Sequence, residues 1–142
     1  INLSNGTYRM FFTESNSITG MSEGSIYGAS SEDGFNWTRD ENVTLVAEEA
    51  YEGRRGFVQA VHPFAIPWQN SYLMFYGSNV RIYAAYSNDS YTWTKLNYTG
   101  INGSDIDGYI IDNETMRVYY GKYSYATGGE VYTGILKIGE IK

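Results

Sequence analysis

Hydrophobic and polar positions alternate over short runs along most of this chain, and no segment of helical periodicity separates the runs. Aromatic, β-branched and other apolar residues recur in segments bounded by Ser, Asn, Gly and Asp, which is the pattern of half-buried strands and turns. The sequence therefore predicts β-strands over residues 8–12, 25–30, 37–46, 57–66, 71–76, 80–86, 92–96, 109–111, 116–120 and 130–138.

Part of this pattern is repeated. Residues 26–38 and 82–94 both contain a short β-type run followed by Ser-x-Asp-x-x-x-Trp-Thr, in the same register. An aromatic segment before it also repeats, because residues 72–77 align with 8–13 and with 116–121. Repetition of this kind indicates one supersecondary unit that is used several times.

The order of segments within the unit predicts the fold class. Each unit reads as an inner strand, an aromatic strand, a strand of small residues, a turn with Asp and Trp, and an outer strand. Four antiparallel strands in about 45 to 55 residues are typical of a β-propeller blade. We therefore expect an all-β protein with propeller-type repeats, forming one domain over residues 1–142 with about three blades. Their approximate bounds are 1–46, 57–98 and 104–142, and the third unit lacks the Ser-x-Asp turn.

Composition supports this class and excludes several partners. Aromatic residues make up 17% of the 142 residues, with 15 Tyr and 16 Gly, which favours strands and tight turns. The net charge of −6 argues against nucleic acid as a partner. No apolar run approaches the roughly 20 residues of a transmembrane helix, so no membrane insertion is expected. The absence of cysteine excludes disulfides and thiolate metal sites.

Asparagine usage bears on the compartment. Eight of the 11 Asn residues begin an Asn-x-Ser/Thr sequon, whereas the 24 Ser and Thr residues would place about two there by chance. Turns rich in these residues generate some sequons without any function. We nevertheless predict a glycoprotein that is extracellular or displayed on the cell surface. The predicted acceptors are Asn2, Asn5, Asn36, Asn42, Asn88, Asn97, Asn102 and Asn113.

The pattern Tyr-x-Met-Phe-Tyr-Gly at residues 72–77, together with the Ser-x-Asp turns, resembles the blades of five-bladed propeller enzymes that act on carbohydrates. These include arabinan- and fructan-cleaving hydrolases and mannoside phosphorylases. The turns also resemble a shortened sialidase Asp-box. The resemblance covers most of the chain, and it specifies architecture better than activity.

The repeated Asp and Trp residues are interpreted as structural. An Asp in a tight turn accepts backbone N–H bonds, and a Trp four residues later packs between sheets. We therefore predict that Asp33 and Trp37 stabilise one turn, and that Asp89 and Trp93 stabilise the other.

In the resembling hydrolases, carboxylates on the inner strands carry catalysis, one as a general acid and one as a base or nucleophile. The resemblance places Asp107 at one of these positions, where the family has Asp-Pro and this chain has Asp107-Gly108. The family's Glu-Gly-Pro corresponds to Val61-His62-Pro63, so the general-acid Glu is absent. Glu52, earlier in the same segment, is a second candidate carboxylate.

Several residues near this position are candidate ligand contacts. His62, the only histidine, fits either a hydrogen-bonded rim residue or a functional one. Arg54 and Arg55 fit either a solvated loop or a pair that binds an anionic group. Gln59 and Trp68 complete the predicted set, since polar side chains bond to sugar hydroxyls and aromatic rings stack on sugar faces.

No cofactor is expected, although Asp105, Asp107 and Asp112 leave Ca²⁺ as an alternative without the EF-hand spacing. We predict a glycan-binding protein without standalone hydrolase activity. One alternative is a glycoside hydrolase or phosphorylase fragment that another chain completes, and a second is a structural component of an extracellular coat or filament. Because open blades leave unpaired edges, we expect either a homo-oligomer, with two copies closing a six-bladed ring, or one piece of a longer or cleaved protein.

Overall fold

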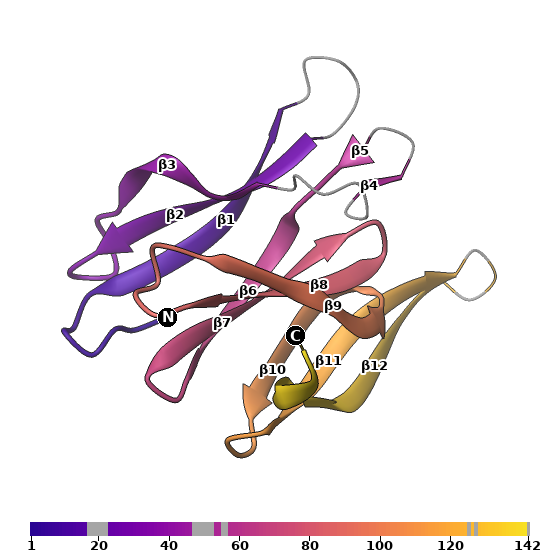
Figure 1. Ribbon diagram of the computed structural model, residues 1–142. Helices are drawn as coiled ribbons and strands as arrows, with labels where there is room; N and C mark the ends of the chain where they lie inside the picture. Colours follow the sequence, from indigo (N-terminus) through magenta and orange to yellow (C-terminus); the bar gives the residue numbers. More distant parts are fainter. Residues whose placement is uncertain (17–22, 47–52, 55–56, 125, 127, 142) are drawn as a thin grey trace.

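The computed structural model describes residues 1–16, 23–46, 53–54, 57–124, 126 and 128–141. Its longer strands form three antiparallel sheets that lie next to one another (Figure 1). The first sheet has the order β1-β2-β3, with strands Tyr8–Asn16, Glu23–Ser31 and Thr38–Val46. The middle sheet has the order β6-β7-β8-β9, with strands Val61–Trp68, Ser71–Ser78, Arg81–Ser87 and Thr94–Asn102. The third sheet has the order β10-β11-β12, with strands Ser104–Ile110, Thr115–Ser124 and Gly128–Lys137.

The remaining elements are short. Strands β4 (Gly53–Arg54) and β5 (Phe57–Val58) pair between the first and middle sheets in the sequence, and the 3₁₀ helix η2 (Ile138–Glu140) follows β12. No α-helix occurs in the ranges that the structure describes, and none of their elements is a helix long and apolar enough to cross a membrane. The predicted all-β class with propeller-type sheets is confirmed.

The number of strands per sheet differs from the prediction. The middle sheet has the four strands expected, in the predicted order from inner to outer. The first and third sheets each have three named strands. In the first sheet only Ile1 and Asn2 occupy the inner position, where the amide of Arg9 donates to the carbonyl of Ile1 at 2.8 Å. In the third sheet η2 follows β12, where the other two sheets have an Asp turn and an outer strand.

The core lies in two layers, one on each face of the middle sheet. Alternate residues of β7 point to opposite faces. Met74 and Tyr76 pack with Ile26 and Leu45 of the first sheet. Leu73 and Phe75 belong to the second layer, in which the residues of the third sheet are Ile106, Met116, Val118 and Leu136. Because both of its faces are covered, β7 is a nearly continuous apolar run rather than an alternating one.

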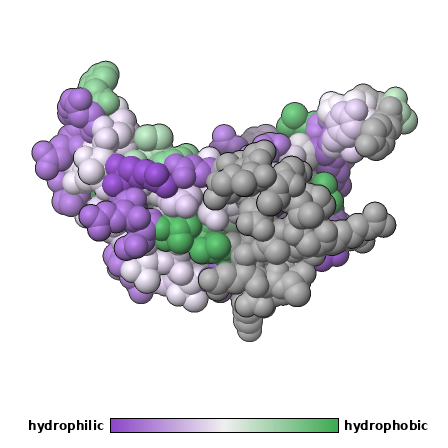
Figure 2. All heavy atoms as spheres, turned by 90° about the horizontal axis from the view of Figure 1, so that it is seen from above, coloured by the Kyte–Doolittle hydropathy of each residue, from purple (hydrophilic) through white to green (hydrophobic). Residues whose placement is uncertain are grey.

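The sheets have two distinct ends. Strands β6 and β10 begin at one end, which we call the site end, and β1 and β7 finish there. The opposite end carries the turns at residues 32–37 and 88–93 and the hairpins at 69–70 and 111–114, and we call it the turn end. Figure 2 views the molecule from above, where hydrophobic residues form small patches separated by hydrophilic ones.

Candidate functional site

The inner strands of the middle and third sheets begin with the same irregularity. The register of β6 shifts between Val61 and Phe64, and that of β10 shifts between Ser104 and Asp107. Within each shift one residue has a left-handed backbone, namely His62 with φ 52° and Asp105 with φ 53°. Bulges re-aim side chains and are over-represented beside functional sites. The two bulges occupy equivalent places on adjacent inner strands.

The two bulged residues contact each other across the sheets. The imidazole Nδ1 of His62 lies 2.8 Å from Oδ1 of Asp105, and the contact is an ion pair when the imidazole is protonated. Both side chains remain more than half exposed, at 55% and 64%. The backbone amide of His62 also donates to Oγ1 of Thr13 at 3.0 Å, which connects the first sheet to the same point. One exposed polar junction therefore joins all three sheets.

Asp107 does not share this junction. It is paired in register with Tyr119, on the face of β10 and β11 that is turned away from the middle sheet. Its Oδ1 accepts the amide of Gly108 at 2.6 Å. The structure thus brings Asp105, rather than Asp107, to His62.

The other predicted ligand contacts are dispersed. Gln59 forms a parallel bridge with Gly24, three residues before His62 in the chain. Trp68 lies at the turn end of β6, where its indole Nε1 donates to the carbonyl of Asn113 at 3.1 Å and its ring packs edge-on against Tyr86. Glu52, Arg55 and the side chain of Arg54 lie outside the described residues. Trp68 therefore joins two sheets at the far end from His62.

The acidic residues considered for Ca²⁺ are separated in the same way. Oδ1 of Asp112 accepts the amides of Glu114 at 2.9 Å and Thr115 at 2.8 Å, in the hairpin at the turn end. These bonds, with the Glu114 amide as the largest cause, lower the pKa of Asp112. Within the part of the chain that the structure describes, no three His, Asp or Glu side chains are grouped as metal ligands.

Both Asp turns form the hydrogen bonds typical of tight turns. In the first, Oδ1 of Asp33 accepts the amides of Phe35 at 2.8 Å and Asn36 at 2.7 Å. Its other oxygen accepts Nδ2 of Asn36 at 2.7 Å, and Oγ of Ser31 donates to Oδ1 at 3.0 Å. The bonds from Asn36 are the largest cause of a strongly lowered pKa for Asp33.

In the second turn, Oδ1 of Asp89 accepts the amides of Tyr91 at 2.8 Å and Thr92 at 2.7 Å, and Oγ of Ser87 donates to it at 3.0 Å. Burial by itself would raise the pKa of Asp89, but the bonds from Thr92, Tyr91 and Ser87 outweigh it and lower the pKa. Both carboxylates therefore stabilise their own turn by accepting its backbone amides.

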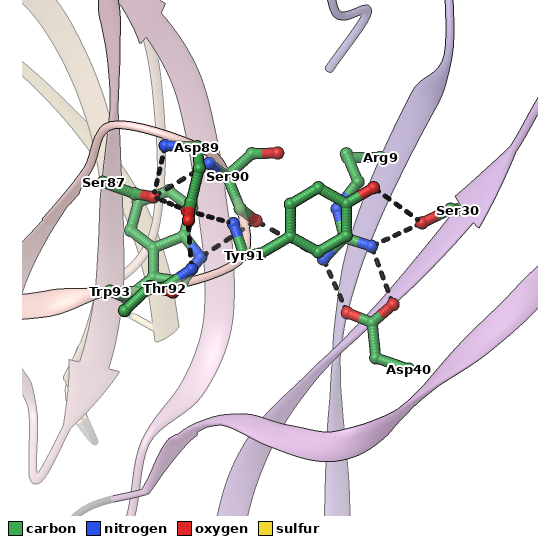
Figure 3. Close-up of polar contacts among 9 residues, drawn as sticks. All are labelled: Arg9, Ser30, Asp40, Ser87, Asp89, Ser90, Tyr91, Thr92 and Trp93. Atoms are coloured by element: carbon green, nitrogen blue, oxygen red, sulfur yellow. Dashed lines mark hydrogen bonds and ion pairs between the residues drawn. The ribbon is translucent and has the colours of Figure 1, made fainter.

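Sequence reasoning missed the residue that connects the second turn to the first sheet. The side chain of Arg9 on β1 is fully buried and forms a two-bond ion pair with Asp40 on β3, at 2.8 and 2.6 Å (Figure 3). It also donates to Oγ of Ser30 at 2.6 Å and to the carbonyl of Ser90 at 3.4 Å, and its guanidinium lies 4.0 Å from the ring centroid of Tyr91.

A glycine makes room for this ion pair. A Cβ added to Gly28 would collide with Oδ2 of Asp40 and Nη2 of Arg9. The second copy of the repeat has Ala84 at this place and Leu73 in the place of Arg9. The departure from the repeat at these two positions was the only sequence signal of the buried pair.

Asp105 and Thr13 were also missed as partners of His62. Their proximity depends on two bulges and on the contact between sheets. His and Asp adopt a positive φ more often than most residues, but glycine is the usual residue there, so the two residue types gave only a weak signal of the bulges.

Solved structures of other proteins have a similar architecture, although sequence comparisons found no relative. No protein-family model matches the sequence, and no curated protein matches it. Among solved structures, a thermostable family-43 glycoside hydrolase superposes with a TM-score of 0.73 and 18% identity, over 95% of this chain and 51% of that one. The GH32 β-fructofuranosidase of Bombyx mori superposes with a TM-score of 0.70 and 15% identity, over 94% of this chain and 32% of that one.

This chain thus spans between a third and a half of the length of the solved structures it matches. At these identities the likeness concerns the fold. The predicted resemblance to carbohydrate-active propellers is confirmed at that level, and the chain has the β-propeller blade fold found in GH32 and GH43 glycoside hydrolases.

Proposed function

We propose that this chain is a glycan-binding part of a β-propeller and that the junction of His62, Asp105 and Thr13 is its binding point. The carrying observation is the pair of equivalent bulges that bring a half-exposed imidazole and a carboxylate to 2.8 Å. Such groups bond to sugar hydroxyls as donor and acceptor. The similar solved structures, a family-43 glycoside hydrolase and a GH32 β-fructofuranosidase, support a carbohydrate as the class of ligand.

Binding without standalone hydrolysis is the form of this function that we favour. Hydrolysis by the common mechanism needs one carboxyl group that donates a proton and a second that stays ionised, both flanking the same bond. At the place where the resembling enzymes have a general-acid Glu, this chain has Val61-His62-Pro63. Asp107, the other predicted catalytic carboxylate, faces away from His62.

A glycan array followed by calorimetry on the best ligands tests the proposal. We expect binding to a neutral oligosaccharide, and an affinity at least tenfold lower for His62→Ala. The exposed Asn70 at the turn end provides the control, since Asn70→Ala should bind like the parent protein. If no glycan binds, or if His62→Ala binds as tightly as Asn70→Ala, the proposal is wrong.

A second candidate function is a glycoside hydrolase or phosphorylase whose ring is completed by further blades. The observation that favours it concerns the two end faces. The N-terminal end face comprises Tyr8, Met10, Phe12, Tyr27 and Val43, and the C-terminal end face comprises Tyr109, Arg117, Tyr119, Val131 and Ile135. By strand alternation both faces point away from the middle sheet.

Each end face repeats residues that are buried between sheets elsewhere. Val131 is 81% exposed, whereas Ile26 and Ile82 at the equivalent places of the other two sheets are fully buried. At the other end, the rings of Phe12 and Tyr27 stack at 6.2 Å, just as those of Tyr76 and Tyr83 stack at 5.9 Å inside the core. Each face therefore matches one half of a blade–blade interface.

Two copies of the chain would supply six blades, within the range of four to eight typical of closed propellers. Size-exclusion chromatography with light scattering tests whether two copies of the chain form this ring. We expect a dimer that Val131→Asp dissociates and that Val80→Asp does not, because Val80 is 77% exposed on a hairpin outside both end faces. A parent protein that stays monomeric would overturn the two-copy ring.

Activity assays separate the two candidates. An enzyme completed by further blades should cleave aryl glycosides as the dimer, and Asp107→Asn should abolish that activity. Activity that survives Asp107→Asn would remove Asp107 from the mechanism.

A further inference from the structure

The eight predicted sequons are distributed unevenly over the fold. Every one of their Asn residues is exposed. Five of them lie at the turn end, in its hairpins and Asp turns: Asn2, Asn5, Asn36, Asn88 and Asn113. Only Asn102, the last residue of β9, lies at the site end. Two other Asn residues lie at the site end, Asn16 at the end of β1 and Asn79 in the hairpin between β7 and β8. Neither begins a sequon.

The remaining two sequons are the most informative, because they lie within strands rather than turns. Asn42 on β3 and Asn97 on β9 each precede the residue that pairs with the repeated Tyr of the neighbouring strand, Val43 with Tyr27 and Tyr98 with Tyr83. The two Asn-x-Thr segments thus occupy the same register position in two sheets. Chance sequons produced by turn composition do not account for this pair.

The strands that carry this pair are edges. Both β3 and β9 have a neighbour on one side only among the described strands. An exposed edge presents unpaired N–H and C=O groups to which another chain can add, and proteins protect such edges by covering them. A bulky, hydrophilic group on Asn42 or Asn97 would cover the middle of each edge.

We propose that Asn42 and Asn97 carry N-linked oligosaccharides that shield these two edges. The donor is an oligosaccharide linked to a lipid diphosphate. The Asn Nδ2 forms a bond to the anomeric carbon, the bond from that carbon to the diphosphate oxygen breaks, and the lipid diphosphate leaves. The amide nitrogen gives up one proton to a base of the transferase. This inference does not depend on the proposed glycan-binding function.

Glycopeptide mass spectrometry on the protein purified from the organism that makes it tests the proposal. Oligosaccharide on both Asn42 and Asn97 is the expected result. The variant Asn97→Gln should lose the mass of one glycan and Thr99→Ser should retain it, since serine also completes the sequon. Asn79→Gln, outside any sequon, should keep all glycans. If the peptides of Asn42 and Asn97 are unmodified in the native protein, the proposal is overturned.

Shielding has its own readout. The double variant Asn42→Gln/Asn97→Gln should aggregate at lower protein concentration than the parent glycoprotein, while its circular dichroism in the strand region is unchanged. The matched double variant Asn79→Gln/Asn70→Gln should aggregate like the parent. Equal aggregation of the two double variants would refute the shielding role.

Discussion

The two Asp turns have nearly the same internal hydrogen bonds but very different surroundings. The amides of Gly34 and Ser90 donate to the preceding Ser hydroxyl at 2.8 and 2.9 Å, and the indoles of Trp37 and Trp93 donate to a backbone carbonyl at 3.1 and 3.2 Å. In the first turn, however, Phe35 is 88% exposed.

In the second turn the equivalent Tyr91 lies over the guanidinium of Arg9. Trp93 packs edge-on against Phe11 with the ring centroids 5.4 Å apart. The repeated motif therefore encodes the conformation of the turn, and Arg9 and Phe11 of the neighbouring sheet determine whether the turn packs against another sheet.

Removal of Arg9, which contacts the second turn, should have the largest effect on stability. Arg9→Ala leaves the carboxylate of Asp40 without its buried partner and removes the cation under Tyr91, so we expect the free energy of unfolding to fall by about 3 to 5 kcal/mol. Urea unfolding followed by tryptophan fluorescence measures it. The control is Arg39→Ala on the same sheet, whose pair with Glu14 is about half exposed and should cost roughly 0 to 1 kcal/mol. Similar losses for the two variants would mean that burial of the ion pair is unimportant.

The next largest difference should come from the two carboxylates. Asp33→Ala and Asp89→Ala each remove the acceptor of two turn amides, so both variants should unfold at a lower temperature than the parent protein. We expect Asp89→Ala to have the larger effect, because its turn also positions Tyr91 on Arg9. Thermal unfolding of both variants measures the difference. Equal losses would indicate that docking on the first sheet does not depend on turn geometry.

Exchanging the residues at the left-handed position should change the free energy of unfolding in opposite directions in the two turns. Ser90 has φ 66° and a buried hydroxyl with no hydrogen-bond partner among the described residues, whereas Gly34 has φ 77° at the equivalent place. Ser90→Gly should stabilise the protein by about 1 kcal/mol, since glycine adopts this conformation without steric cost. Gly34→Ser should destabilise it. The melting temperatures of the two variants should move in opposite directions, and a shift of the same sign would refute this explanation.

The smallest expected effect is the acid dependence of the exposed turn. The pKa of Asp33 is lowered in the folded protein, so its contribution to stability is present above the ordinary Asp pKa of about 3.9 and is lost as the pH falls toward the folded value. Asp33→Asn should flatten the fall in stability below about pH 4, as measured by unfolding at a series of pH values. An unchanged slope would show that Asp33 does not contribute to acid sensitivity.

The fold was largely predictable because its signals are local. The apolar and aromatic runs within residues 71–86 and the repeated Ser-x-Asp-x-x-x-Trp-Thr specify strands and turns through neighbouring residues, and the middle sheet has the predicted four strands. The number of strands in the flanking sheets was less predictable. There, pairing depends on whether a partner strand is present beside β1 and β12, which the pattern within a strand does not report.

The candidate site was predictable only in part. His62 was identified from its position beside the absent glutamate, but the candidate carboxylate named on the third inner strand was Asp107, whereas Asp105 is the one that contacts His62. The bulge at Asp105 changes which side chain of β10 reaches the neighbouring strand, and a one-residue irregularity reverses the face of every residue on one side of it.

The strands, the two Asp turns and the positions of the sequons follow from local sequence, because each depends on residues within a few places of one another. The tertiary structure alone decided that Asp105 meets His62, that Arg9 is buried beneath the second turn, and that Asn42 and Asn97 share one register position on two edges. These relations join residues that are far apart in the chain, and they exist only once the sheets have paired and packed face to face.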